Sequence, residues 1–314
     1  MGLLQLTFLC IAAFFTCSCS PEGAWDLMRF HSDGSPSAFR IKLTFLNKSQ
    51  SENLDDFPVL VALTPQRVTY SNLNSDGTDI PYNPQPADVW SNGYAGVWHL
   101  QESQETLRDS TINGNHGVNF GTVTAMGRMG GGRFFDGSDD FINCGNGSSL
   151  EITGEISLSA WVKPATDPYS VMRIVSKKAA WDAPAGYGLA IDPTTEEIHH
   201  LGSGGWPFGT GIAPNINQDL QFIAGTTIGT SSLVYWNGDE VTTLFTNFAL
   251  AADAENLCIG RIPGAPPPNA DFFYGIIDEV RVSNTIRSPD WYRAQYKSMT
   301  DTFLEYGTEE KAGD

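Results

Sequence analysis

An aspartate within the last hydrophobic strand is the residue whose surroundings most clearly require a polar, charged or metal partner. Strict alternation along residues 276–282 places Asp278 on the same face as three aliphatic side chains and turns Glu279 and Arg281 to the other face. A carboxylate in an apolar stripe is costly unless it is paired, hydrogen-bonded or bound to a metal. Calcium accepts carboxylate and carbonyl oxygens in flexible geometry. Asp278 therefore predicts a structural calcium ion.

Two other interpretations of acidic residues stay open. Asp278 has the alternative role of capping a turn or pairing with Arg133 or Arg128. Asp109 begins a segment rich in Asp, Asn and Gly that has enough oxygens for a metal. The same composition forms ordinary Asx turns, and that interpretation is favoured.

Aromatic side chains in loops are the candidates for a glycan site, because the apolar faces of sugars stack on aromatic rings. Trp181 and Trp206 lie in Gly- and Pro-rich segments, and Tyr187 ranks behind them as a third candidate. Each loop tryptophan has the equal alternative of covering the edge of the fold. Three tryptophans in or beside periodic segments are expected to be core residues: Trp98, Trp161 and Trp291.

Signatures of common hydrolases are missing from the sequence, which favours a protein that is not an enzyme. The sequence has no Glu-x-Asp-x-x-Glu strand, which would bring an acid and a nucleophile to about 5 Å from each other. It also has no Gly-x-Ser-x-Gly elbow and no His-Glu-x-x-His helix. Adjacent strand residues point to opposite faces, so His199 and His200 are interpreted as polar residues at a strand edge rather than as a metal site.

The amino-terminal segment and the cysteines indicate an exported protein. Residues 2–18 are apolar and uncharged, as in the core of a secretory signal, although a non-cleaved anchor is an alternative. Cys19 follows a serine and imperfectly resembles a lipidation site. Cys144 and Cys258 remain after processing and either form one disulfide or stay as buried free thiols.

Net charge narrows the class of partner. The 314-residue chain has 18 Lys and Arg against 36 Asp and Glu, a formal charge of −18, which repels the phosphates of nucleic acids. Anionic membrane surfaces are excluded in the same way, so a membrane is expected only through a lipid on Cys19. Neutral sugars and calcium are more compatible with the negative electrostatic field of this chain.

Short alternating segments predict an all-β fold. Residues 39–45, 157–163, 232–236 and 278–282 alternate between apolar and polar side chains, and Asn237-Gly238 marks a hairpin turn. One helix is expected over residues 288–296, with Ser288 as its N-cap. Many short antiparallel strands without helical crossovers are typical of a two-sheet sandwich.

Five motifs, in order, resemble the LamG-like jelly-roll domains of the concanavalin A-like lectin/glucanase superfamily: GYAGVWHLQES, LRDSTINGNHG, GGGRFFDGSDDFINCG, SLSAWVKP and YGIIDEVRVSNTIRSPDWYRAQY. The resemblance implies an antiparallel jelly-roll sandwich that binds glycans or other surface ligands. Laminarinase-type relatives with an Asp two residues before a Val-Arg-Val run hold a structural calcium, which implies Asp278 as a ligand with the carbonyl of Gly137 and with Asp136. The upstream segment resembles the start of a bacterial domain found on secreted proteins.

These observations divide the chain into five parts: a signal peptide at 1–19, a truncated β domain at 38–80, a linker at 81–92, the jelly roll at 93–306 and a flexible tail at 307–314. We expect a secreted or surface-anchored, non-catalytic module for carbohydrate or an extracellular surface protein. A structural or adhesion component of the envelope without a small ligand is the alternative, followed by a glycoside hydrolase or lyase.

Overall fold

The computed structural model describes residues 11–19, 24–30, 36–45, 54–63, 89–165, 171–180, 182–203, 209–216, 218–228, 231–244, 249–266 and 270–311. The chain forms two compact units, one of residues 1–85 and 297–314 and the other of residues 86–296. The boundary after residue 85 falls in the Pro-rich stretch. No helix among the described residues is long and apolar enough to cross a membrane.

The first unit is built from strands at both ends of the chain. β1 (Ile11–Cys19) pairs with β4 (Leu54–Leu63), and β3 (Pro36–Phe45) lies between β2 (Ala24–Phe30) and β22 (Leu304–Lys311). The expected flexible tail from Gly307 is therefore wrong for residues 307–311, which belong to β22 and of which 309–311 pair with β3. The upstream β segment gains a strand from the far end of the sequence, which local patterns do not reveal.

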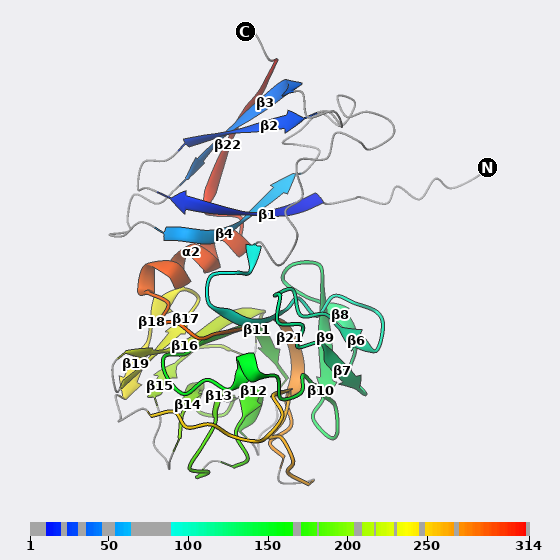
Figure 1. The fold of residues 1–314 in the computed structure, drawn as a ribbon, viewed down its shortest axis with the longest axis vertical. Helices are drawn as coiled ribbons and strands as arrows, with labels where there is room; N and C mark the ends of the chain where they lie inside the picture. Colours follow the sequence, from blue (N-terminus) through cyan, green and yellow to red (C-terminus); the bar gives the residue numbers. More distant parts are fainter. Residues whose placement is uncertain are drawn as a thin grey trace, which may run out of the picture. The chain divides into compact units, whose positions relative to one another are not determined.

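The second unit is a sandwich of two antiparallel sheets (Figure 1). One sheet runs in the order β19 (Thr242–Leu244), β15 (Gly209–Ile212), β14 (Glu197–Leu201), β13 (Tyr187–Asp192), β12 (Met172–Lys177), β20 (Cys258–Ile259), β10 (Phe141–Asn143), β7 (Gly117–Phe120) and β6 (Thr106–Leu107). The other runs β18 (Asp239–Glu240), β17 (Ser231–Trp236), β16 (Gln221–Ile228), β11 (Ser157–Pro164), β21 (Tyr274–Ser283), β9 (Gly131–Asp136) and β8 (Val123–Met126), and β5 (Tyr94–Trp98) also pairs with β21.

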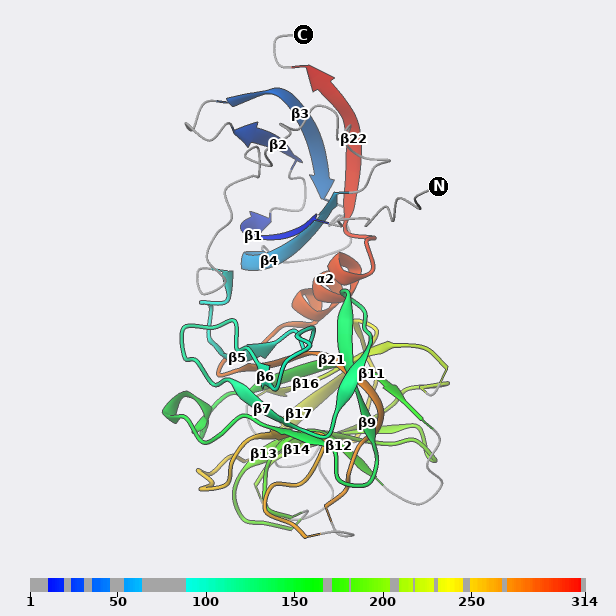
Figure 2. The same cartoon turned by 90° about the vertical axis from the view of Figure 1, so that its right-hand side faces the viewer.

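The core lies between these two sheets, which Figure 2 shows as stacked layers within the unit. Alternating aliphatic residues of both sheets form it, and Trp98 is fully buried there. The expected hairpin is present, because Asn237 and Gly238 both have positive φ between β17 and β18. The strands expected from alternation are confirmed within β3, β11, β17 and β21.

A short 3-10 helix, η2 (Ser148–Leu150), and the helix α2 (Pro289–Met299) complete the described elements. The expected helix is confirmed, because the Ser288 hydroxyl accepts a hydrogen bond from the Trp291 amide at 3.1 Å. Tyr292 and Tyr296 lie against Tyr235 and Trp161, at 4.5 and 5.7 Å between ring centroids. The helix therefore covers an outer part of the β11–β17 sheet.

A β-bulge in β21 changes which side chains face the core. Ser159 pairs with Arg281 and Trp161 with Asp278, so two residues of β21 oppose Ala160 alone. Glu279 has φ of +53° at this point. The residues of β21 that enter the core here are Ile277, Val280 and Val282. Asp278 and Arg281 therefore share the outer face, and the expected strict alternation is wrong at the bulge.

Candidate functional site

Asp278 is fully buried, and its partners are backbone groups of a turn. Its Oδ2 accepts hydrogen bonds from the amides of Arg128, at 2.6 Å, and Met129, at 3.3 Å. Gly127 and Gly132 fit against the Asp278 side chain, where an added Cβ would meet Oδ2 at 2.4 Å and the Asp278 Cβ at 3.2 Å. These contacts of Oδ2 are those expected from the alternative prediction, an aspartate that caps a turn.

The three expected calcium ligands do not come together. Asp136 pairs with Tyr274, whereas Asp278 lies four residues further along β21, a separation of about 13 Å at 3.3 Å per residue. Calcium–oxygen distances are about 2.3–2.6 Å. Asp278 therefore cannot share one ion with Asp136 and Gly137, because the strand register separates them.

A buried ionic cluster surrounds the bulge instead. The Glu279 carboxylate contacts His99 Nδ1 at 2.7 Å and Arg281 Nη2 at 2.8 Å. Although burial opposes its charge, these two cations lower the pKa of Glu279 to about 2, and Glu279 in turn raises the pKa of His99. Burial and the adjacent Glu279 raise the pKa of Asp278 to about 7. The Arg281 guanidinium also lies 4.7 Å from the ring of Trp90.

The cluster is closed to large ligands, because its acidic and guanidinium groups are almost fully buried. Asp278, Glu279 and Arg281 expose 0–3% of their surface. The other metal candidate, Asp109, accepts hydrogen bonds from the amides of Val97 and Thr111 at 3.0 and 2.9 Å. The favoured interpretation of an ordinary Asx turn is confirmed.

Of the three expected aromatic platforms, Tyr187 is the one that lies among the described residues. Trp181 and Trp206 lie outside the described residues. Tyr187 exposes 1% of its surface and donates a hydrogen bond from its hydroxyl to the Leu150 carbonyl at 3.0 Å. The expectation that Tyr187 binds a ligand is therefore wrong, because its alternation turns the ring into the core.

The two cysteines and the histidine pair are also buried. Cys144 and Cys258 are free thiols. Asn143, not Cys144, pairs with Cys258, so the sulfurs lie on opposite faces of the sheet, and of the two predicted alternatives the buried free thiols are found rather than the disulfide. His199 and His200 do point to opposite faces, but they are 1% and 0% exposed in β14 rather than at an edge. Burial lowers their pKa values to about 4 and about 3.

An exposed aromatic hollow lies on the outer face of the β6–β19 sheet. Phe120 at the end of β7 and Phe141 at the start of β10 are stacked, with ring centroids 4.5 Å apart and planes within 4°. Ile142 enters the core, so Phe141 faces outward. Phe120 is 44% exposed. The hollow has a volume of about 370 Å³, and its lining consists of Phe120, Gly121, Asp139, Phe141, Arg261 and Phe272.

Arg261 is held between two of these rings. Its guanidinium carbon lies 4.6 Å from the ring centroid of Phe141 and 5.1 Å from that of Phe272. Nε donates to the Ile262 carbonyl at 2.8 Å, and Nη2 donates to the Ala265 carbonyl. These bonds fix the guanidinium while other N–H groups of its five donors remain for a ligand.

An acidic group borders the hollow. Asp136, Asp139 and Asp140 place carboxylate oxygens within 4.8 Å of one another, and Asp139 lines the hollow. Asp136 Oδ1 accepts from the Ser138 amide at 2.8 Å, and Asp140 Oδ2 accepts from the Asp136 amide at 2.9 Å. Burial, together with the two neighbouring carboxylates, raises the pKa of Asp140.

The aromatic hollow escapes sequence reasoning because no local pattern joins its parts. Phe120, Phe141, Arg261 and Phe272 come from four separate segments that the sheet brings together. One signal was available: Phe141 directly precedes Ile142, so a strand that buries the isoleucine turns the phenylalanine to the outside. Tryptophans drew attention instead because they are the larger stacking surfaces.

Comparisons with known proteins identify the fold of this unit. Residues 136–291 match the family model described as the concanavalin A-like lectin/glucanases superfamily. No curated protein sequence matches the chain at a significant level.

Solved structures that are similar to this chain have low sequence identity to it. A Trypanosoma rangeli sialidase mutant displaying trans-sialidase activity is 14% identical with a TM-score of 0.50, over 68% of this chain and 34% of the sialidase. The binding domain of Paraclostridial Mosquitocidal Protein 1 is 12% identical with a TM-score of 0.50, over 68% of this chain and 53% of that one. Domain 4 of the Geobacillus stearothermophilus arabinanase AbnA, in complex with arabinotriose, is 21% identical with a TM-score of 0.45, over 64% and 96%. The chain thus spans only about a third of the sialidase chain.

Proposed function

Residues 136–291 belong to the concanavalin A-like lectin/glucanases superfamily, and from this premise we propose that the chain is a non-catalytic carbohydrate-binding module. We propose that its binding surface is the hollow formed by Phe120, Phe141, Phe272 and Arg261. The observation that carries the proposal is a pair of stacked phenylalanine rings, one of them 44% exposed, beside a fixed guanidinium.

The chemistry of the hollow suits a sugar ring. The carbon-bearing faces of sugars are apolar and stack on aromatic rings, while their hydroxyls accept hydrogen bonds from a guanidinium. Ligand sites are commonly hollows of about 300–1,000 Å³ with aromatic walls and a few polar groups, and this hollow of about 370 Å³ falls at the lower end of that range. Asp139 at its border adds an acceptor for sugar hydroxyls.

The test is a binding screen of the full chain against neutral and acidic polysaccharides by affinity electrophoresis, followed by isothermal titration of each hit. We expect Phe141→Ala to weaken binding at least tenfold, about 1.4 kcal/mol. Ile286→Ala is the matched control, because Ile286 is also partly exposed, at 37%, and is not part of the hollow. Silence across the whole screen would favour a structural or adhesion role without a small ligand.

The non-catalytic part of the proposal has its own measurement. Each polysaccharide that binds is incubated with the chain, and newly formed reducing ends are counted. We expect no increase over a heat-inactivated sample. A steady release of reducing ends that Phe141→Ala abolishes would show a glycoside hydrolase instead.

Calcium and export stay predictions. The carbohydrate proposal does not depend on calcium, and Asp278 is engaged by the turn at Arg128 and Met129. The apolar composition of residues 2–18 supports export to the outside of the cell or its envelope. Fractionation of expressing cells tests this, with the chain expected in the medium or the envelope fraction.

A further inference from the structure

A second hollow adjoins the aromatic one and shares two of its residues. It has a volume of about 360 Å³, and Phe141 and Arg261 line both hollows. Asn143 lies two residues after Phe141 in β10, on the same outer face. Cys258 pairs with Asn143 and also lines the second hollow. The two hollows therefore adjoin at Arg261 and Phe141, and together they are called the groove.

The two halves of the groove differ in chemistry. Three phenylalanine rings line the first hollow, whereas Asn143, Glu255 and Asn256 bring amide and carboxylate groups to the second. An aromatic wall selects the apolar face of a ring. A wall of amides and carboxylate instead selects hydroxyl groups through hydrogen bonds.

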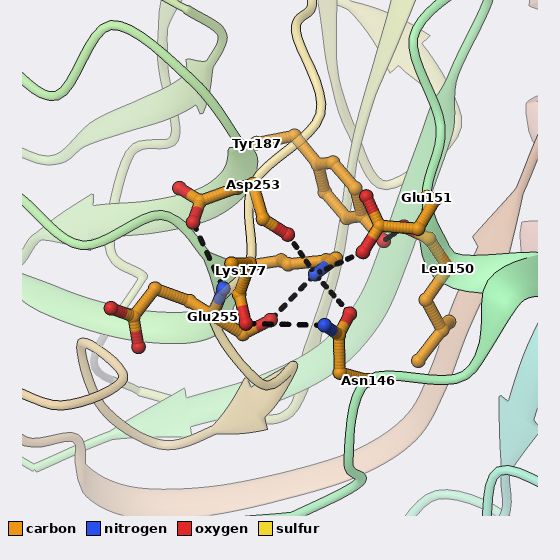
Figure 3. A network of polar contacts seen from close by, with 8 residues as sticks. Asn146, Leu150, Glu151, Lys177, Tyr187, Asp253 and Glu255 are labelled. Atoms are coloured by element: carbon orange, nitrogen blue, oxygen red, sulfur yellow. Dashed lines mark hydrogen bonds and ion pairs between the residues drawn. The ribbon is translucent and has the colours of Figure 1, made fainter.

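A buried ammonium fixes the wall of the second hollow. Lys177 exposes 1% of its surface, and its Nζ donates to the carbonyls of Asp253 and Glu255 and to Oδ1 of Asn146, each at 2.5 Å (Figure 3). The carboxylate of Glu151 lies 3.1 Å from the same nitrogen.

Further bonds tie the same loop down. The Asn146 amide donates to the Ala254 carbonyl at 3.1 Å, and the Glu255 amide donates to Asp253 Oδ1 at 3.0 Å (Figure 3). Residues 253–255, which directly precede the exposed Asn256, are thereby anchored to Lys177 and Asn146. A wall fixed in this way loses little conformational entropy when a ligand binds.

We propose that the groove binds an oligosaccharide through two adjoining subsites, a stacking subsite at Phe120 and Phe141 and a hydrogen-bonding subsite at Asn143 and Asn256. Arg261 lies between them and contacts both sugar units. Lys177 is a positioning residue for the second subsite. The inference rests on the proposed function, since it names the size of ligand that the same groove takes.

The experiment uses a ladder of one to six sugar units, made by partial hydrolysis of the polysaccharide that binds in the screen. Affinities of the full chain are measured by isothermal titration, or by saturation-transfer NMR for the shortest members. We expect affinity to rise at least tenfold from one unit to two or three and to level off by the longer members.

Two variants separate the subsites. Phe120→Ala is expected to weaken every member of the ladder at least fivefold. Asn256→Ala is expected to leave the single sugar unchanged and to weaken the trisaccharide about two- to tenfold, the effect of one hydrogen bond. Asn256 is exposed, so truncation of its side chain leaves the fold intact, and Asn284→Ala, at another exposed asparagine that lines neither hollow, is the matched control.

Lys177→Met tests the positioning role. We expect it to reproduce the pattern of Asn256→Ala, with an unchanged single-sugar affinity measured at a temperature where circular dichroism shows a folded chain. Equal affinities for one and three units, with Asn256→Ala silent, would overturn the two-subsite inference and leave the proposed function standing. A silent Phe120→Ala on every member would overturn both.

Discussion

The outer faces of the two sheets differ in how far their charged and aromatic side chains are buried. On the β11–β21 side, Asp278, Glu279 and Arg281 are almost completely buried and are bonded to one another, to His99 or to backbone amides. On the β7–β10 side, Phe120 is exposed and Arg261 lines both hollows of the groove. The ionisable side chains of the first face are therefore enclosed within the fold, whereas Phe120 on the second face is open to solvent where a ligand can reach it.

The largest expected effect comes from breaking the buried cluster. Glu279→Ala removes the carboxylate that contacts both His99 and Arg281 and leaves the Arg281 guanidinium buried without this carboxylate. Loss of one partner from a buried ion pair costs about 3–5 kcal/mol, and urea denaturation measures it. A loss below about 1 kcal/mol would show that water reaches the cluster and would remove the contrast between the two faces.

The second prediction concerns the dependence of stability on pH. The folded-state pKa of Asp278, about 7, lies above the value of about 3.9 in an unfolded chain, so between these values the folded state binds the proton more tightly. The contribution of Asp278 to stability is therefore present at pH 4, falls as pH rises towards 7 and stays low above it.

Asp278→Asn tests this sign, because the amide keeps an oxygen for the Arg128 backbone and cannot ionise. We expect the variant to melt above the wild type at pH 8 and close to it at pH 4, in thermal scans at several pH values. Asp219→Asn, which alters an exposed carboxyl outside the acidic group, is the control. Parallel curves for wild type and Asp278→Asn would contradict the buried, raised pKa.

The third prediction tests the outer face on the β7–β10 side, where the exposed ring of Phe120 lies. Phe120→Ala removes an exposed ring, so we expect the free energy of unfolding to change by less than about 1 kcal/mol while binding to the hit polysaccharide falls at least fivefold. A large loss of stability without a loss of binding would show that Phe120 is a structural residue and would contradict the proposal that the groove binds a sugar.

The smallest expected effect is that of calcium. Extracellular modules bind calcium with Kd values of about 0.1–1 mM, so 1 mM calcium at a site of Kd about 1 mM adds only about 0.4 kcal/mol. Thermal scans with calcium and with chelator measure this shift. We expect Asp136→Asn with Asp139→Asn to remove it, since these carboxylates lie together, and Asp278→Asn to keep it. Loss of the shift in Asp278→Asn alone would restore the sequence-based calcium site.

The fold was predictable because its signals are local. Alternation along residues 157–163 and 232–236, the Asn237-Gly238 turn and the cap at Ser288 each depend on a few neighbouring residues, and each is found in the structure. The pairing of β22 with β3 was not predictable in this way. It joins segments more than 250 residues apart, and no local pattern in either strand indicates which strand it pairs with.

The site was less predictable, because a site depends on register. A one-residue bulge at Glu279 exchanged the faces of β21 and turned Asp278 away from the core. In the same way, Cys258 pairs with Asn143 rather than with Cys144, and this one-residue offset separates the two sulfurs. Tyr187 followed the alternation of its own strand into the core, although its loop-like neighbours had suggested a platform.

The sequence alone determined that this chain builds an antiparallel sandwich with an acidic surface, since periodicity, turn residues and charge are written residue by residue. Only the tertiary structure decided which side chains meet. Four segments supply Phe120, Phe141, Arg261 and Phe272, and the pairing of strands sets their neighbours. A single shift in that pairing reverses the direction of a side chain, so the position of a binding surface is a property of the assembled sheets.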